Sequence, residues 1–464
     1  MSSSAVPPRA RNLFVGGTAS HVGKSWFTSA ICRYLRNRGI RVAPFKAQNM
    51  SNNSGPARIS GNGSGDSYGE IGRAQIAQAD ACGLLPETDM NPILLKPNSD
   101  LGSQVVLNGR VWKDLSASDY YQHSSDLFAH VLKAYERLSS RYDFIVIEGA
   151  GSVAEMNLKA RDLVNFGLAE RVGAPALLVA DIDRGGVFGS LVGTLSLLCP
   201  EERSLVRSFA VNRFRGDGSL FADGVRFLEA KTGSPCLGVF PFMPGIALDE
   251  EDGVSLGSAS KDGTIAIVRL PHVSNFTDFN RIAGSRWLGA PDRHLYDAVI
   301  LPGTKNTAGD LQWLRDTGFD AWILRQHAAG ATVIGICGGY QMLGRSIDGE
   351  TGLGLLDVRT TMRTEKTVRP VDASINNVAF PAYEIHMGVT ETPSGCEPFA
   401  FLAGQPEGIR QGRCLGTYLH DALRSDAVLD ALGFQCVERV RPYDQLASWF
   451  ETHANTALFE ELYL

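Results

Sequence analysis

The stretch that decides the fold of the first half of the chain runs from Asn12 to Asn37 and reads NLFVGGTASHVGKSWFTSAICRYLRN. It opens with a short apolar run that ends at two glycines, continues through a polar loop, and closes with a helix-like pattern from Trp26 onward. Strand, glycine-containing loop and helix in this order are typical of a parallel sheet that binds phosphate where the helix begins. The stretch therefore predicts an α/β fold whose first loop contacts a nucleotide.

The loop itself, Gly17 to Ser25, carries groups suited to phosphate. Glycines let backbone N–H groups approach phosphate oxygens, Lys24 adds a cation, and the Ser25 hydroxyl can reach Mg²⁺. The usual spacing, G-x-x-x-x-G-K-[ST], is altered because position 18 is threonine and the glycine comes one residue earlier. A glycine turn with a surface lysine is the alternative. The flanking strand and helix favour an ATP site formed by Gly17, Thr18, Gly23, Lys24 and Ser25.

A triphosphate site also needs a carboxylate that can bind a metal ion. Glu148 ends the apolar run Phe144 to Ile147 and precedes Gly149 to Gly151. The carboxyl ends of strands in such sheets face the ligand crevice, so we expect Glu148 to bind Mg²⁺ together with Ser25. The alternative is that Glu148 caps a neighbouring turn.

With 464 residues, the chain is longer than one hydrophobic core usually organises. The acidic, Gly- and Ser-rich stretch from Pro244 to Thr264 predicts a linker. We therefore expect an α/β fold of two domains, residues 12–245 and 262–464. The stretch from Ser51 to Tyr68 predicts a long flexible loop, and Tyr443 to Leu462 a closing helix. The other expected strands are Leu13 to Gly16, Arg41 to Phe45, Ala176 to Ala180, Phe209 to Asn212, Cys236 to Val239, Ile265 to Arg269, Ala298 to Leu301, Thr332 to Ile336, Tyr383 to Thr390 and Cys414 to Tyr418.

Composition excludes several classes of partner. The net charge of -6 provides no basic face for nucleic acid. No apolar run approaches the roughly 20 residues that span a bilayer, and Met1 to Asn12 lacks the apolar core of a secretory signal, so we expect a cytoplasmic protein without membrane contact. The eight cysteines form no C-x-x-C pair, which argues against a disulfide framework or a structural zinc site. The sequence leaves homo-oligomer formation open.

A second catalytic pattern lies in the second half, where Cys337 stands between an apolar run and a helix-like stretch with glycines on its C-terminal side. This is the layout of a nucleophile elbow, in which the helix start lowers the pKa of the thiol. The N–H of Gly338 would point toward a developing oxyanion, and a second donor would come from the Leu301 to Thr304 loop, which contains Gly303. A buried apolar cysteine is the alternative.

The cysteine needs a base, and two histidines compete for the role. His420 follows the late strand Cys414 to Tyr418, and His386 lies in the Tyr383 to Gly388 segment. Spacing alone does not choose between them.

Beyond these motifs, six long blocks in order resemble the glutamine-hydrolysing cobyric acid synthase family of cobalamin assembly, over nearly the whole chain. They are APFKAQNMS (43–51), GEIGRAQ (69–75), MNPILLKP (90–97), DIDRGG (181–186), SNFTDF (274–279) and YEIHMG (383–388). The first half also looks like dethiobiotin synthetase, and the second half is similar to class I glutamine amidotransferases.

The resemblance implies further site roles. It assigns Lys24 and Ser25 to phosphate, Asn212 to adenine and Glu70 to a further magnesium ligand, and it makes Cys337 the nucleophile. His420 is then its base. Ordinary class I glutaminases carry a carboxylate two residues after this histidine, but the position is Ala422 here, so the group that orients the base is missing or replaced.

The family resemblance implies an enzyme that uses ATP, Mg²⁺ and glutamine to amidate a corrinoid. The b, d, e and g carboxylates of adenosylcobyrinic acid a,c-diamide would react through acyl phosphates with ammonia taken from glutamine. Cobyrinic acid a,c-diamide synthase is the nearest enzymatic alternative, and the APFKAQNMS and MNPILLKP blocks argue against it. A P-loop switch with an inactive glutaminase is the alternative from another class. Gln48, Asn49, Arg73 and Gln75 are candidates for corrinoid contact.

Overall fold

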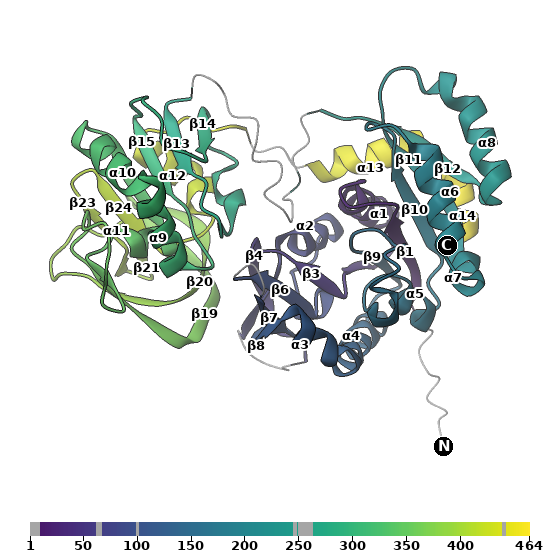
Figure 1. Ribbon diagram of the computed structural model, residues 1–464, viewed down its shortest axis with the longest axis horizontal. Coiled ribbons are helices and arrows are strands. Elements are labelled where there is room, and N and C mark those ends of the chain that lie inside the picture. Colours follow the sequence, from purple (N-terminus) through teal and green to yellow (C-terminus); the bar gives the residue numbers. More distant parts are fainter. Residues whose placement is uncertain (1–9, 62–66, 99–101, 245–247, 249–262, 439–441) are drawn as a thin grey trace.

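The computed structural model describes residues 10–61, 67–98, 102–244, 248, 263–438 and 442–464. Two α/β units are visible, one in purple to teal and one in green (Figure 1). This arrangement confirms the predicted fold class. Within the described ranges, no helix combines the length and the apolar character that a membrane crossing requires.

The first unit is built on a six-stranded parallel sheet in the order β12-β11-β10-β1-β9-β2. Every strand predicted here from an apolar run is present. The central strand β1 pairs with β9 and β10, so the loop that follows it lies at the middle of the sheet. The bounds are β1 (Arg11–Gly17), β2 (Val42–Phe45), β9 (Phe144–Glu148), β10 (Ala176–Asp181), β11 (Val206–Phe214) and β12 (Cys236–Pro241).

Helices of the first unit cover this sheet through their apolar faces (Figure 1). Helix α1 buries Phe27, Ile31 and Leu35 against β1 and its neighbours, which explains the apolar spacing of its sequence. The helices are α1 (Lys24–Asn37), α2 (Arg73–Cys82), α3 (Ala117–Gln122), α4 (Ser124–Ser139), α5 (Phe166–Val172), α6 (Val187–Leu197), α7 (Pro200–Leu205) and α8 (Ala222–Thr232).

Two small sheets that the sequence did not reveal lie beside the main sheet. One contains β3 (Gln48–Met50), β6 (Ile93–Pro97), β7 (Gly102–Leu107) and β8 (Arg110–Ser116). The other pairs β4 (Ser54–Arg58) with β5 (Tyr68–Gly72) in antiparallel fashion. The prediction of a flexible loop over Ser51 to Tyr68 is therefore wrong for most of that stretch, because its small polar residues hydrogen-bond inside the protein. Residues 62–66 lie outside the described ranges.

The second unit contains a sheet in the order β14-β13-β15-β16-β24-β23, parallel except for its edge strand β23. Its strands are β13 (Ile265–Val268), β14 (Ser285–Leu288), β15 (Ala298–Leu301), β16 (Thr332–Ile336), β23 (Ile409–Gln411) and β24 (Cys414–Thr417). Its helices are α9 (Thr307–Thr317), α10 (Phe319–Ala328), α11 (Gly338–Leu343) and α12 (Asp426–Leu432). The strands that apolar runs predicted after the linker are observed.

A long hairpin of β19 (Arg359–Ile375) and β20 (Val378–Glu391) reaches from the second unit to the first, where it contacts β4 and β5. Both strands extend beyond what the apolar pattern of the sequence predicts. Their outer parts are polar and exposed, so they lack that pattern. Four short strands complete this sheet: β17 (Ser346–Ile347), β18 (Glu350–Thr351), β21 (Ala400–Leu402) and β22 (Gln405–Glu407).

The chain ends on the first unit rather than the second (Figure 1). Helices α13 (Pro442–His453) and α14 (Thr456–Tyr463) pack on α1 and β12 and bury Phe450 and Phe459 in the core of the first unit. The expected second domain, residues 262–464, therefore ends too late. The single helix predicted over Tyr443 to Leu462 is two helices, because Asn455 interrupts it and caps α14 through Leu458 N–H. The linker prediction falls largely outside the described residues.

Candidate functional site

Cys337 lies on a sharp turn between β16 and α11. Its φ of 50° and ψ of −107° are unusual for a residue with a side chain, and such strain is typical of a nucleophile elbow. Gly339 makes the turn possible, because a Cβ there would overlap the Leu301 carbonyl oxygen. The thiol donates toward the Ile385 carbonyl oxygen at 3.6 Å. The predicted strand, turn and helix around Cys337 are all present.

His420 is held by a carboxylate that the sequence analysis missed. Its Nδ1 lies 2.7 Å from Asp278 Oδ2, and both side chains are buried. Burial acts to lower the pKa of His420, but the Asp278 carboxylate and a hydrogen bond with Cys337 raise it to about 10. The structure thus brings Cys337, His420 and Asp278 together in a group that favours a protonated imidazole beside the thiol.

The competing base, His386, is held in other contacts. Its Nδ1 lies 2.8 Å from the Gly388 carbonyl oxygen, and its Nε2 lies 3.6 Å from Glu384 Oε1. Its ring stacks on Tyr418 with a centroid distance of 4.0 Å. The geometry therefore favours His420 as the partner of Cys337.

The oxyanion loop predicted from Leu301 to Thr304 lies over the elbow. A Cβ placed on Gly303 would stand 3.2 Å from the His420 ring, and one placed on Gly338 would stand 3.0 Å from Thr304 N. The Leu301 to Thr304 loop therefore packs closely against both the elbow and His420.

Asp278 takes the place of the carboxylate that is absent at position 422. It lies in a short 3-10 helix, Phe276–Phe279, in the connection that follows β13. β13, β15, β16 and β24 are neighbours in the sheet, so the connections after them meet at one edge. The SNFTDF block held the signal, since its aspartate follows a predicted strand, but no spacing rule links it to a histidine 142 positions later.

In the first unit, Lys24 and Ser25 lie where the sequence predicted. The Lys24 ammonium donates to the Gly151 carbonyl oxygen at 2.7 Å and the Ala19 carbonyl oxygen at 3.1 Å. Gly23 has a φ of 104°, which favours glycine, and it places the start of α1 against the loop. Ser25 Oγ donates to Glu148 Oε1 at 2.9 Å.

Glu148 is also bound by Lys46, whose Nζ lies 3.1 Å from Oε1, and by the Gln78 amide. A hydroxyl and a carboxylate that meet beside a lysine and a helix N-terminus fit Mg²⁺ and a phosphate group. Ser25 and Glu148 would hold the ion, and Lys24 with Gly17, Thr18 and Gly23 would hold the phosphates.

Two further residues, Asn212 and Glu70, have roles implied only by resemblance. Asn212 lies in β11 beside the loop, where its amide donates to the Val22 carbonyl oxygen at 2.8 Å. The Glu70 carboxylate is bound by Lys96 and Lys366. The magnesium role of Glu70 stays a prediction that the resemblance implies.

Comparison with known proteins agrees with this geometry. Residues 13–256 match the CobQ/CobB/MinD/ParA nucleotide binding domain, and residues 264–428 match the CobB/CobQ-like glutamine amidotransferase domain. Cobyric acid synthase of Cereibacter sphaeroides is 44% identical over 96% of this chain and 98% of its own length. That of Chlorobium phaeobacteroides is 43% identical over 97% and 99%, and that of Salmonella typhimurium 43% over 94% and 91%. The chain belongs to the cobyric acid synthase family.

A member of this family is an ATP-dependent ligase that takes nitrogen from glutamine, and here the two units touch beside the glutaminase group. Ser54 N–H donates to Asn275 Oδ1 at 3.0 Å, and Thr277 Oγ1 donates to Asn53 Oδ1 at 3.2 Å. Both contacts hold the short helix that carries Asp278. The first unit therefore helps to position a side chain of the second.

Helix α2 of this cobyric acid synthase family member touches both sites. Arg73 at its start forms an ion pair with Asp421 at 3.0 Å, next to His420, and Gln78 binds Glu148. Of the other corrinoid candidates, Asn49 donates to Gln75 at 2.8 Å, and Gln48 accepts from Tyr120 at 2.5 Å. These polar groups hold one another, and Arg73 links the units.

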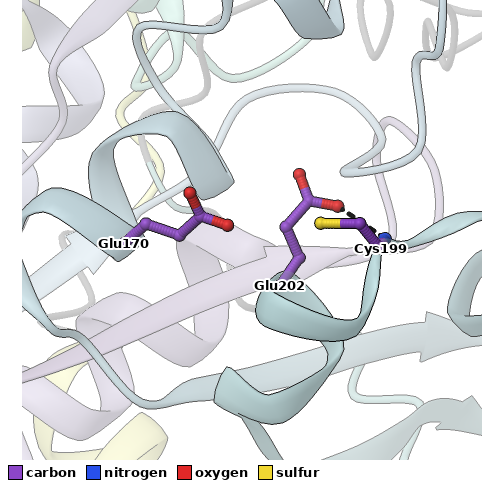
Figure 2. A group of neighbouring side chains, drawn as sticks. All are labelled: Glu170, Cys199 and Glu202. Atoms are coloured by element: carbon purple, nitrogen blue, oxygen red, sulfur yellow. Dashed lines mark hydrogen bonds between the residues drawn. The ribbon is translucent and has the colours of Figure 1, made fainter.

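Among the described residues, Glu170, Cys199 and Glu202 form a group of potential metal ligands (Figure 2). The ligand atoms of Glu170, Cys199 and Glu202 lie within 4.8 Å of one another. Glu202 already caps α7 by accepting from Cys199 N–H at 3.0 Å, and it binds Lys159 at 2.6 Å. A helix cap with an ion pair accounts for the arrangement.

Proposed function

We propose that the chain converts adenosylcobyrinic acid a,c-diamide to adenosylcobyric acid by amidating its b, d, e and g carboxylates with ATP and glutamine. The observation that carries the proposal is the coexistence of a Cys337–His420–Asp278 group and a Lys24–Ser25–Glu148 group in one chain. The family supports amidation in cobalamin synthesis. The four positions and the acyl phosphate are the proposed refinements.

At the glutaminase site, the Cys337 thiolate attacks the side-chain amide carbon of glutamine and forms a C–S bond. The N–H groups of Gly303 and Gly338 stabilise the oxyanion. The C–N bond then breaks while His420 protonates the departing nitrogen, which leaves as ammonia. Water, deprotonated by His420, cleaves the thioester to glutamate and restores the thiol. Asp278 keeps the imidazole oriented through these steps.

At the phosphate site, a substrate carboxylate oxygen attacks the terminal phosphorus of ATP, and ADP leaves. Lys24 offsets negative charge on the transferring group, and α1 directs its N-terminal N–H groups toward the phosphates. Ser25 and Glu148 would hold Mg²⁺, which supplies charge balance for the phosphates. Ammonia then attacks the acyl carbon, phosphate leaves, and an amide remains.

The direct test incubates the purified protein with ATP, glutamine and adenosylcobyrinic acid a,c-diamide, and follows corrinoid mass together with glutamate and ADP. The proposal predicts four successive replacements of carboxylate by amide, each with one glutamate formed. In a parallel incubation, amidation of cobyrinic acid at the a and c positions, with no amidation of the diamide, would identify the a,c-diamide synthase activity instead. ATP turnover without any amide would favour the P-loop switch and contradict the proposal.

A further inference from the structure

Three lysines and one glutamate meet where the hairpin of the second unit contacts the first. Lys96 Nζ donates to Ser54 Oγ at 2.8 Å and to Glu70, and Lys366 of β19 binds the other Glu70 oxygen. Lys305, which directly follows the oxyanion loop, donates to Gln104 Oε1 at 2.8 Å. We call Lys96, Lys305 and Lys366 the interface lysines.

The charges of this group do not balance among the residues that the structure describes. Three lysines accompany one buried carboxylate, Glu70. The other carboxylate that acts on the pKa of Lys305 is Asp114 of β8, and it is exposed. Lys96 is 3% exposed and the Lys366 side chain 11%. Burial of surplus positive charge is costly unless an anion accompanies it.

Burial and the neighbouring ammonium groups both act on the pKa of two of these lysines. Burial, aided by the Lys366 and Lys96 ammoniums, lowers the pKa of Lys305 to about 7 although Glu70 acts to raise it. Burial likewise lowers the pKa of Lys96 to about 8, with Glu70 opposing and Lys366 adding to the effect. A bound anion would relieve the repulsion between these ammonium groups.

The group lies close to the chemistry. Lys305 is the residue after Thr304, whose backbone nitrogen would lie 3.0 Å from a Cβ placed on Gly338 of the elbow. Glu70 pairs with both Lys96 and Lys366, whereas Lys305 donates to a neutral amide, that of Gln104. Lys305 is thus the cation best placed to receive an added carboxylate.

We propose that the interface lysines form a binding site for a substrate carboxylate, with Lys305 as its direct ligand. This proposal rests on the proposed function, which supplies two substrates with a carboxylate. The carboxylate is either a peripheral acid group of the corrinoid or the α-carboxylate of glutamine. Glu70 fixes Lys96 and Lys366 in place, and their charge attracts the incoming anion. The site joins the two halves because its lysines come from both units.

The test compares Lys305→Met with the wild-type full-length chain in two assays. One varies the corrinoid acid with ammonium chloride as the nitrogen donor, and the other varies glutamine and measures glutamate without corrinoid. A charge-assisted hydrogen bond to carboxylate predicts a KM rise of about tenfold in one assay, with kcat retained. Lys305→Arg should restore most of the affinity, and Lys133→Met, an exposed lysine on α4, is the matched control.

A second variant keeps the proposal testable if Lys305→Met folds poorly. Gln104→Glu places an internal carboxylate against Lys305, so it should compete with the substrate and raise the same KM while thermal stability is kept. A rise in the corrinoid assay identifies the corrinoid as the source, and a rise in the glutamine assay identifies glutamine. Unchanged KM values in both assays would overturn the proposal and leave a structural ion cluster. If the wild type makes no amide, the proposed function fails, and the glutamine assay alone decides this site.

Discussion

The phosphate site and the glutaminase site occupy the same kind of place, the carboxyl ends of parallel strands, yet they are assembled differently. At the phosphate site, Lys24 and Ser25 belong to one loop, and Glu148 ends the adjacent strand β9. At the glutaminase site, Cys337, His420 and Asp278 come from three separate connections. Two of the three groups at the phosphate site share one loop and are therefore encoded locally, whereas the glutaminase site depends on the whole sheet.

The second difference is dependence on the neighbouring unit. Asn53 and Ser54 hold the Asp278 segment, and Arg73 holds Asp421 beside the base, all from the first unit. The glutaminase geometry is therefore completed by contacts from outside its own sheet. Changes at this interface should alter glutamine use more than they alter the chemistry with free ammonia.

The largest effect is expected from loss of the phosphate-loop cation. Lys24→Ala should lower amide formation about 10³-fold with either glutamine or ammonium chloride, because both routes need the activated carboxylate. Corrinoid product measured by mass spectrometry checks this. Lys133→Ala, an exposed lysine on α4, should behave as wild type. Full product formation by Lys24→Ala would remove the phosphate site from the reaction.

Asp278→Asn should lower glutamine hydrolysis about 10²-fold and leave amidation with ammonium chloride nearly unchanged, because the His420 imidazole loses its anionic partner. Glutamate release measures the first quantity, and Asp316→Asn, an exposed carboxylate on α9, is the control. Equal losses in both assays would mean that Asp278 supports folding rather than His420.

The pH profile of the same variant sharpens this prediction. Asp278 raises the pKa of His420 against the lowering effect of burial, so wild-type His420 stays protonated until the pH approaches about 10. In Asp278→Asn, burial acts without that opposition, and the alkaline limb of the glutaminase profile should move to lower pH. A limb that does not move would contradict the positioning role.

A smaller effect is expected across the interface. Arg73→Met removes the ion pair to Asp421, so glutamine hydrolysis should fall about tenfold while ammonia-dependent amidation falls less. The ratio of the two rates is the measurement, with Arg171→Met, exposed on α5, as the control. An unchanged ratio would show that the second unit positions His420 by itself.

The smallest effect on turnover is expected from the C-terminal helices. Phe450 is fully buried against Tyr34 and Phe240 of the first unit, so Phe450→Ala should cost that unit about 3–5 kcal/mol of unfolding free energy. Turnover at 25 °C should stay near wild type. Denaturant unfolding checks this against Phe401→Ala, a half-exposed aromatic of the second unit. Destabilisation confined to the second unit would contradict the observed packing.

Local patterns predicted much of this molecule because local chemistry built it. The strands of both main sheets were predicted from short apolar runs. The loop from Gly17 to Ser25 and the elbow at Cys337 were predicted because each joins a strand to a helix through glycines within a few residues. The pairing of β4 with β5 was missed because these strands lack an apolar pattern. Ser54 and its polar neighbours are buried and are held by hydrogen bonds.

What the sequence could not predict depends on contacts between distant segments. Phe450 and Phe459 pack in the core of the first unit. The sequence did not predict this, because an amphipathic helix could pack on the core of either unit. Glu70 shows the same limit, since the family resemblance assigned it to magnesium and only the fold places Lys96 and Lys366 against it. The replacement of the expected triad carboxylate by Asp278 likewise needed the strand order of the second sheet.

The most direct test of the two-site account measures amide formation by Cys337→Ala with glutamine and with ammonium chloride. The account predicts that glutamine-dependent product disappears while ammonia-dependent product forms at a rate near that of the wild type. Loss of both would contradict separate sites, and survival of glutamine-dependent amidation would remove Cys337 as the nucleophile.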